Sequence, residues 1–309
     1  MKESEIIARL RRFATDPAAR GLADDAALLD GLVITHDMIA EGVHFLPADP
    51  PSSVGWKLVA VNLSDLAAKG AAPRAALLSM TIGDPDWDEG FVDGIEAACE
   101  YYGLSLIGGD TIALPEGAPR VFGLTAIGRA GERVPSRAGA QPRDRLWLVG
   151  TLGDSAAGLA QLRADPEATG LMVDQYRRPV PLLAAGQALA GEAKAMMDVS
   201  DGLLIDLARM CAASGCGAEV ALDALPLSNA FVAKRGDGRE ARLLAATGGD
   251  DYALLAALPA EFDALSFSLP SGTRVTGIGR MTDAPGLTLF SDGEPVALPA
   301  TLGFEHGGD

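Results

Sequence analysis

Cysteine, histidine and aromatic residues are scarce in this chain of 309 residues. The three cysteines, Cys99, Cys211 and Cys216, are odd in number and form no Cys-x-x-Cys spacing. Neither a disulfide framework nor a zinc site is therefore expected. With only three histidines, transition-metal sites are poorly supported as well. This cysteine usage fits a reducing compartment, so we expect a cytoplasmic protein.

Basic residues are also few. The chain has 25 Lys and Arg residues and 42 Asp and Glu residues, which gives a net charge of −17. Such an acidic surface repels the phosphate backbone of nucleic acids and the anionic surface of membranes. No apolar run approaches the ~20 residues that span a bilayer. Residues 1–13 are charged and helix-like, unlike a signal peptide. We therefore expect neither nucleic acid nor a membrane as partner.

Familiar nucleotide-binding and nucleophile motifs are missing. None of the five lysines follows a glycine, which excludes a P-loop. No Gly-x-Gly-x-x-Gly is present, which disfavours a Rossmann dinucleotide site, and no Gly-x-Ser-x-Gly elbow is present either. The glycine-rich stretch 150–158 opens a helix and is the remaining candidate for a phosphate-binding turn.

Glycine, by contrast, is abundant at 37 residues, which indicates many tight turns or close approaches of the backbone to a ligand. Apolar segments of strand and helix length alternate along both halves of the chain. That alternation predicts a two-domain fold of the α/β or α+β class. A polar stretch rich in Gly and Pro at 129–143 separates the halves. We therefore predict domains at 1–137 and 138–309.

Several of the acidic residues stand at the ends of apolar segments. Asp-Gly at 30–31 between two apolar runs predicts a hairpin. Its register would place Asp24 opposite Asp37 and Asp25 opposite His36. Like charges opposite one another destabilise a sheet unless a cation neutralises them. The hairpin therefore indicates either a cation site or two exposed acidic turns.

The helix expected at 53–69 is apolar except for one stripe. Asn62, Asp65 and Lys69 share one face, with Lys57 on roughly the same side. Such a stripe either lines a site or faces water, and in the second case Asp65 and Lys69 would form an exposed ion pair.

Two further acidic segments follow the same pattern. Gly108-Gly109-Asp110 comes directly after an apolar strand, and residues 198–202, Asp-Val-Ser-Asp-Gly, precede a helix. A helix cap needs only one such residue, and this segment has three. Mg²⁺ is the cation that takes oxygen ligands from carboxylates and substrate phosphates. Carboxylates, Mg²⁺ and glycine-rich turns together point towards phosphoryl transfer.

Taken together, these segments resemble the thiamine-monophosphate kinase family. This family belongs to a superfamily of ATP-dependent enzymes that includes aminoimidazole ribonucleotide synthetase. The resemblance extends from about Leu22 to Phe304 and rests on ordered blocks at 24–29, 41–45, 61–68, 106–111, 153–159, 198–203 and 248–252.

The resemblance implies direct transfer of the γ-phosphoryl group of ATP to thiamine monophosphate, with several Mg²⁺ ions. It implies two α/β domains of the aminoimidazole ribonucleotide synthetase type and a homodimer formed by the N-terminal domains, with ATP near the subunit boundary. The metal ligands that it implies are Asp24, Asp25, Thr35, His36, Asp37, Asp65, Asp110, Asp198 and Asp201. The catalytic residues that it implies are Asp37, Asp65, Asp110 and Arg137. It assigns Gly109, Asp110, Arg137 and Ser200 to ATP, and His44, Asp250 and Phe304 to thiamine monophosphate.

The chain departs from the family pattern at a few of these positions. The family usually has a hydroxyl residue where His36 stands, Met where Lys69 stands and Glu where Asp250 stands. It usually has Thr or Val followed by Arg where this chain has Ile112-Ala113. Since His36 has no hydroxyl, its backbone carbonyl is the ligand that remains. Three alternatives stay open: another ATP-dependent enzyme of the superfamily, a non-catalytic regulator that binds Mg·ATP, and an acidic scaffold that binds neither.

Overall fold

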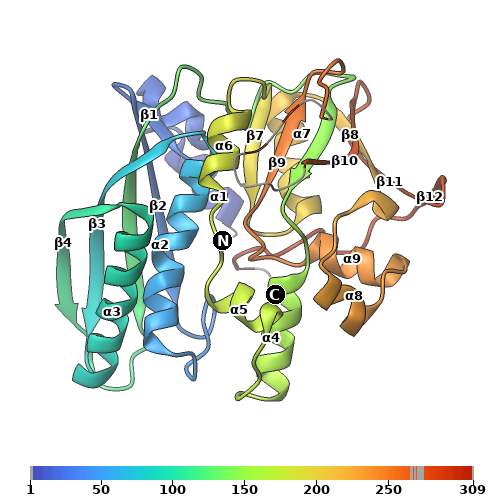
Figure 1. The fold of residues 1–309 in the computed structure, drawn as a ribbon. Coiled ribbons are helices and arrows are strands. Elements are labelled where there is room, and N and C mark those ends of the chain that lie inside the picture. Colours follow the sequence, from blue (N-terminus) through green and yellow to red (C-terminus); the bar gives the residue numbers. More distant parts are fainter. Residues whose placement is uncertain (1–2, 265–266, 268, 270–274, 308–309) are drawn as a thin grey trace.

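Two β-sheets, each built from a different half of the chain, organise the structure (Figure 1). The computed structural model describes residues 3–264, 267, 269 and 275–307. The first sheet has the strand order β1-β2-β5-β3-β4, and the second has the order β12-β11-β8-β10-β6-β9-β7. The predicted two-part fold with mixed helices and strands is confirmed. The boundary between residues 137 and 138 stays a prediction.

The first half places two long helices, α2 and α3, on one face of its sheet, and both contribute to the core beneath it. Its elements are α1 (Glu3–Leu10), η1 (Pro17–Leu22), β1 (Ala27–Leu29), β2 (Leu32–Ala40), α2 (Pro51–Ala68), β3 (Ala72–Ile82), α3 (Pro85–Tyr102), β4 (Ser105–Ala113) and β5 (Val121–Arg129).

The hairpin between β1 and β2 forms in the predicted register, with Leu28 opposite Val33. Strand β1 begins only at Ala27, however. The expected pairing of Asp24 with Asp37 therefore does not form, because the chain before Ala27 has left the sheet.

Helix α2 lies between the two halves and is buried along almost its whole length. One side packs on the first sheet, and Ala67 and Ala68 join a cluster with α6 and β9 of the second half. A Cβ atom at Gly186 of α6 would lie 1.9 Å from the Ala67 carbonyl oxygen, so this close approach of the helices requires glycine. A helix surrounded on all sides is apolar all round, which explains its sequence.

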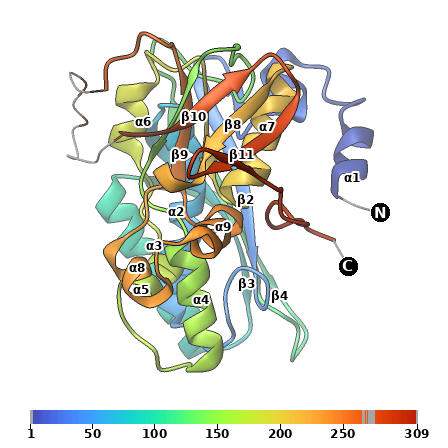
Figure 2. The ribbon, with the colours of Figure 1, turned by 90° about the vertical axis from the view of Figure 1, so that its right-hand side faces the viewer.

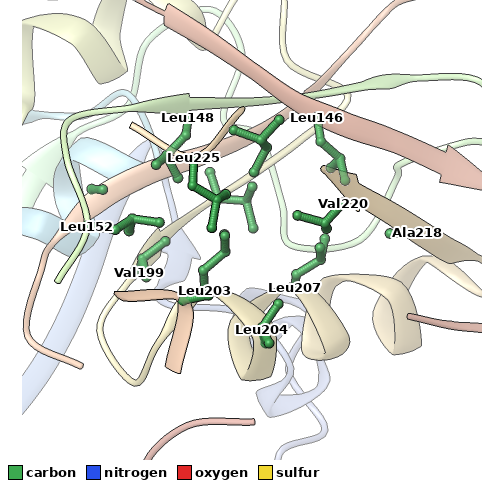
Figure 3. Close-up of a cluster of buried hydrophobic side chains, with 14 of the residues drawn as sticks. Leu146, Leu148, Leu152, Val199, Leu203, Leu204, Leu207, Ala218, Val220 and Leu225 are labelled. Atoms are coloured by element: carbon green, nitrogen blue, oxygen red, sulfur yellow. The ribbon is translucent and has the colours of Figure 1, made fainter. Parts of the chain in front are cut away.

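The second half encloses its own core between the sheet and helix α7 (Figure 3). Figure 2 shows α4, α5, α8 and α9 gathered at one end of this half. Within the described ranges, none of the helices combines the length and hydropathy that crossing a membrane requires. The elements are β6 (Arg145–Val149), α4 (Asp154–Ala164), α5 (Leu171–Arg177), α6 (Leu183–Leu189), β7 (Ala195–Val199), α7 (Leu203–Ser214), β8 (Gly217–Ala221), η2 (Leu222–Ala224), α8 (Asn229–Arg235), α9 (Arg239–Thr247), β9 (Ala253–Leu258), β10 (Val275–Thr282), β11 (Gly286–Ser291) and β12 (Glu294–Val296).

Candidate active site

Four aspartates from separate elements meet where the two halves touch. Asp25 precedes β1, Asp37 lies on β2, Asp65 on α2 and Asp198 on β7. Carboxylate oxygens of Asp25, Asp65 and Asp198 lie within 4.8 Å of one another. Asp37 is close enough that its charge raises the pKa of both Asp65 and Asp198. These four residues are called the aspartate cluster below.

The alternation of side chains along β2 decides which of its residues reach the cluster. Thr35 and Asp37 face α2, and the Thr35 hydroxyl hydrogen-bonds to Asp65. The backbone N–H of Asp37 donates to Asn62 Oδ1 over 2.9 Å, which anchors the strand to the helix. His36 points to the opposite face, where its Nδ1 lies 2.9 Å from the Thr125 hydroxyl. The structure therefore does not bring the His36 imidazole to the cluster.

Three members of the cluster have no basic partner in the part of the chain that the structure describes: Asp37, Asp65 and Asp198. Burial, and then repulsion by Asp25 and Asp201, raises the pKa of Asp37 to about 6. Burial and neighbouring carboxylates likewise raise the pKa of Asp65 and Asp198 well above the ordinary value. Ionised carboxylates this close need a cation, and an all-oxygen donor set suits Mg²⁺.

Basic side chains hold the neighbouring Asp24 and Asp25. Lys69 Nζ lies 2.5 Å from Asp24 Oδ1 and 2.6 Å from Asp25 Oδ2. Arg20 pairs with the second oxygen of Asp24 at 2.6 Å, and Arg137 pairs with Asp25 Oδ1. Burial raises the pKa of Asp24, but attraction to Lys69 and hydrogen bonds from Lys69 and Arg20 outweigh it and lower the pKa to about 2.

The polar stripe on α2 is therefore not solvated. Asn62 and Lys69 are 0% exposed, and Asp65 is 9% exposed. Lys69 pairs with Asp24 and Asp25, so the alternative of an exposed Asp65–Lys69 ion pair is wrong. The sequence signal was present, since these are the polar positions of an otherwise apolar helix, but the partners lie 44 and 45 residues away in the chain.

The segment after β7 adds Ser200 and Asp201 beside the cluster. Asp206 of α7 accepts hydrogen bonds from the backbone N–H groups of both residues, each over 3.1 Å. Arg209 bridges Asp201 at 2.5 Å and Asp206 at 2.7 Å. Asp206 and Arg209 were not among the residues predicted from the sequence. Their spacing of three on the first turns of a helix was the available signal.

A second group of residues adjoins the cluster and contains the predicted substrate contacts. Lys57 Nζ donates to Asp250 Oδ2 and to the His44 carbonyl, both over 2.9 Å. The ring of His306 lies between those of His44 and Phe304. Its centroid is 5.4 Å from that of His44 and 4.9 Å from that of Phe304. His44, Asp250 and Phe304 are thus brought together. Lys57 of the predicted polar stripe joins them, and His306 is an addition that the sequence did not reveal.

Backbone strain marks this second group. Asp250 and Tyr252 adopt left-handed φ values of 67° and 52°. Such conformations cost about 1–3 kcal/mol for residues other than glycine and concentrate at functional sites. The Tyr252 hydroxyl donates to Asp250 Oδ1 over 2.9 Å, and the Asp250 N–H donates to the Ser200 carbonyl over 2.7 Å. These contacts connect the second group to the aspartate cluster.

Gly109 and Asp110 lie elsewhere. They sit inside strand β4 rather than in a turn after a strand, and Asp110 pairs in register with Ser79. Asp110 is exposed and lines a cavity of about 290 Å³ together with Met38 and Gly123, on the face of the sheet opposite to α2. The structure does not bring Asp110 to the cluster of its own chain.

The glycine-rich turn at 150–158 already has a side-chain carboxyl group as its partner. The Gly153 N–H donates to Asp251 Oδ2 over 2.7 Å, and the Ser155 N–H donates to Asp251 Oδ1 over 3.4 Å. Asp251 is buried, which raises the pKa of its carboxyl well above the ordinary value. Because this carboxylate occupies the start of α4, the turn is a structural cap rather than a free phosphate site.

We expect the metal-free chain to lose stability as the pH rises from 5 to 7. The folded-state pKa of Asp37, about 6, lies above its ordinary value of 3.8, so the folded chain binds a proton more tightly than the unfolded chain. For Asp37 alone, the loss is on the order of 1 kcal/mol over this interval. Urea unfolding in EDTA at both pH values measures it. Asp37→Asn removes this contribution, and an unchanged pH difference in that variant would refute the assignment.

Both halves of the chain match one known protein family. Residues 23–130 match the family of AIR synthase related proteins in its N-terminal domain, and residues 141–292 match its C-terminal domain. The two halves that meet at the aspartate cluster are therefore the two domains of that class.

Within this class, the chain belongs to the thiamine-monophosphate kinase family. It is 40% identical to the thiamine-monophosphate kinase of Salmonella typhimurium, over 93% of this chain and 91% of the relative. It is 39% identical to that of Caulobacter vibrioides, over 99% and 91%. The solved structure of AaThiL complexed with AMPPCP and TMP aligns with a TM-score of 0.85 at 30% identity, over 99% of this chain and 97% of that one.

Proposed function

We propose that this chain catalyses the ATP-dependent phosphorylation of thiamine monophosphate to thiamine diphosphate. The observation that carries the proposal is the aspartate cluster at the junction of the two halves, with the second group of residues directly beside it. AaThiL, which shares the fold over almost its whole length, has been solved with AMPPCP, an analogue of ATP, together with TMP. Two anionic substrates brought to one acidic site require charge neutralisation, which is the main task in phosphoryl transfer.

Mg²⁺ fits the residues present. Asp25 Oδ2 is buried and accepts no hydrogen bond of good geometry, although Lys69 lies 2.6 Å away. We propose that Asp25, Asp37, Asp65 and Asp198 hold the ions, with Thr35, Asp201 and the His36 carbonyl nearby. When bound, the ions would neutralise both the carboxylates and the phosphate oxygens. Asp24, whose oxygens are paired with Lys69 and Arg20, would orient these basic groups rather than bind metal.

The remaining side chains of the site suit the binding and orientation of the two substrates. Arg137 is held in place by Asp25, and the same pairing raises the pKa of its guanidinium against the effect of burial. Its fork of donors suits a phosphoryl group of ATP, with Ser200 as a further contact. We propose that His44, Asp250 and Phe304 bind thiamine monophosphate. Burial lowers the pKa of His44, and its Nδ1 accepts a hydrogen bond from the Ala40 N–H over 3.1 Å.

A homodimer would complete the site. The face of the first sheet opposite to α2 exposes large apolar side chains, including Met38, Leu77 and Ile112. Exposed apolar surface of this kind on a sheet favours pairing with a second copy. Asp110 lies on this same face, next to Met38 and Ile112. We propose that Gly109 and Asp110 of one subunit act at the ATP site of the other.

The cellular setting is proposed from the chemistry of the chain. The structure has three free cysteines, at positions 99, 211 and 216. Free thiols suit a reducing compartment such as the cytoplasm, where ATP and Mg²⁺ are also abundant.

Product formation tests the proposal. The purified chain is incubated with ATP, Mg²⁺ and thiamine monophosphate, with thiamine in a parallel tube, and thiamine diphosphate is measured by chromatography. We expect product from the monophosphate, since the γ-phosphoryl group must be accepted by a phosphate oxygen. Binding of Mg·ATP without product would favour another enzyme of the superfamily or a regulator, and absence of binding would favour a scaffold.

A further inference from the structure

We propose that the Lys69 ammonium group takes the place of a divalent cation between Asp24 and Asp25. The chain then binds one divalent ion fewer at this site than the same chain with a neutral side chain at position 69. The inference rests on the proposed function, because it assumes that the aspartate cluster binds metal.

The contacts of Lys69 are those of a bound cation. Its Nζ lies 2.5 Å from Asp24 Oδ1, 2.6 Å from Asp25 Oδ2 and 3.0 Å from the Met196 carbonyl oxygen. The ammonium group donates hydrogen bonds to Asp24 Oδ1 and to the Met196 carbonyl, and Asp25 Oδ2 is held by charge alone. The side chain is 0% exposed, so these contacts are shielded from bulk solvent.

The position of the ammonium group overlaps the metal site itself. Asp25 contributes an oxygen to the group whose ligand atoms lie within 4.8 Å of one another, together with Asp65 and Asp198. Lys69 approaches one oxygen of Asp25, and Arg137 approaches the other. A divalent ion that bridged Asp24 and Asp25 would meet the ammonium group there, since like charges repel strongly in a buried site.

The other carboxylates stay available. Asp37, Asp65 and Asp198 have no basic partner among the described residues. Lys69 therefore supplies positive charge to Asp24 and Asp25, while Asp37, Asp65 and Asp198 are left to exchangeable ions.

A purely structural role makes a different prediction. Lys69 also joins the halves, since Asp24 and Asp25 belong to the first half and Met196 lies on β7 of the second. If that were its only task, removing it would weaken folding at every metal concentration and would create no new ion site.

Counting bound Mn²⁺ by electron paramagnetic resonance separates these roles. We expect Lys69→Met to bind one more Mn²⁺ per subunit than the unmodified chain, and its melting temperature to rise more steeply with Mg²⁺. Lys57→Met is the matched control, because Lys57 is also buried on α2 but pairs with a single carboxylate, Asp250. That control should leave the Mn²⁺ count unchanged.

The outcomes distinguish a failure of the proposed metal site from a failure of the proposed role of Lys69. An unmodified chain that binds no Mn²⁺, or one whose count Asp65→Asn does not lower, would refute the proposed metal site. A Mn²⁺ count that is normal in the unmodified chain but does not increase in Lys69→Met would refute the role of Lys69 alone. Lys69→Gln is the second variant. If both substitutions fold only with Mg²⁺, the proposal is supported, and if neither folds at saturating Mg²⁺, the structural role is correct.

Discussion

Asp65→Asn is expected to reduce kcat for thiamine monophosphate phosphorylation by at least about 10³-fold. Asp65 lies at the centre of the aspartate cluster, where the charges of Asp37, Asp198 and Asp25 raise its pKa in addition to burial. Asparagine keeps the size and the contact with Thr35 but removes one ligand charge. Release of ADP, measured with and without thiamine monophosphate, gives the change in rate.

The fold is expected to survive this substitution. Removing one of several mutually repelling carboxylates relieves strain in the metal-free chain, so its melting temperature should not fall. Asp144→Asn is a suitable control, since Asp144 is also buried but accepts a hydrogen bond from the Gln141 N–H in the second half. Unchanged turnover in folded Asp65→Asn would contradict the proposed role, and a melted protein would indicate a structural one.

The second large effect is expected from mixing two inactive variants. Asp65→Asn and Asp110→Asn should each be inactive alone, because we propose that each site combines Asp65 of one subunit with Asp110 of the other. Equal amounts, unfolded and refolded together, should regain about a quarter of the normal activity, because half of the dimers are mixed and one of the two sites in each mixed dimer is intact.

The expected recovery of activity on mixing depends on the position of Asp110. It lies on strand β4, on the face of the sheet opposite to the aspartate cluster. Mixing two portions of Asp65→Asn is the control and should restore nothing. Recovery with a monomeric molar mass, or no recovery from a mixture shown to contain mixed dimers, would exclude a site shared between subunits.

Local features of the fold were predictable from neighbouring residues. The turn at Asp30-Gly31 sets the register of β1 and β2, because aspartate and glycine accept positive φ, here 50° and 77°. Gly103, at φ 65°, is the C-cap of α3, a position and conformation typical of glycine. In each case the signal and the structure involve only a few consecutive residues.

Predictions that depended on extending a local pattern were less reliable. The hairpin register does not continue to Asp24, because β1 stops at Ala27. The glycines before Asp110 looked like a turn, yet they lie within β4. A Cβ atom at Gly109 would lie 2.0 Å from the Leu78 carbonyl oxygen, so that glycine is required by the neighbouring strand rather than by a ligand.

The acidic character of the site, the choice of an oxygen-binding cation and the family can all be identified from residue types and their order along the chain. The partners of each charge cannot. Lys69 meets Asp24 and Asp25, and Lys57 meets Asp250, only because α2 is buried between the two halves. Burial is a property of the packed molecule, and in a medium of low dielectric it determines which carboxylates are neutralised by lysine and arginine and which remain for metal.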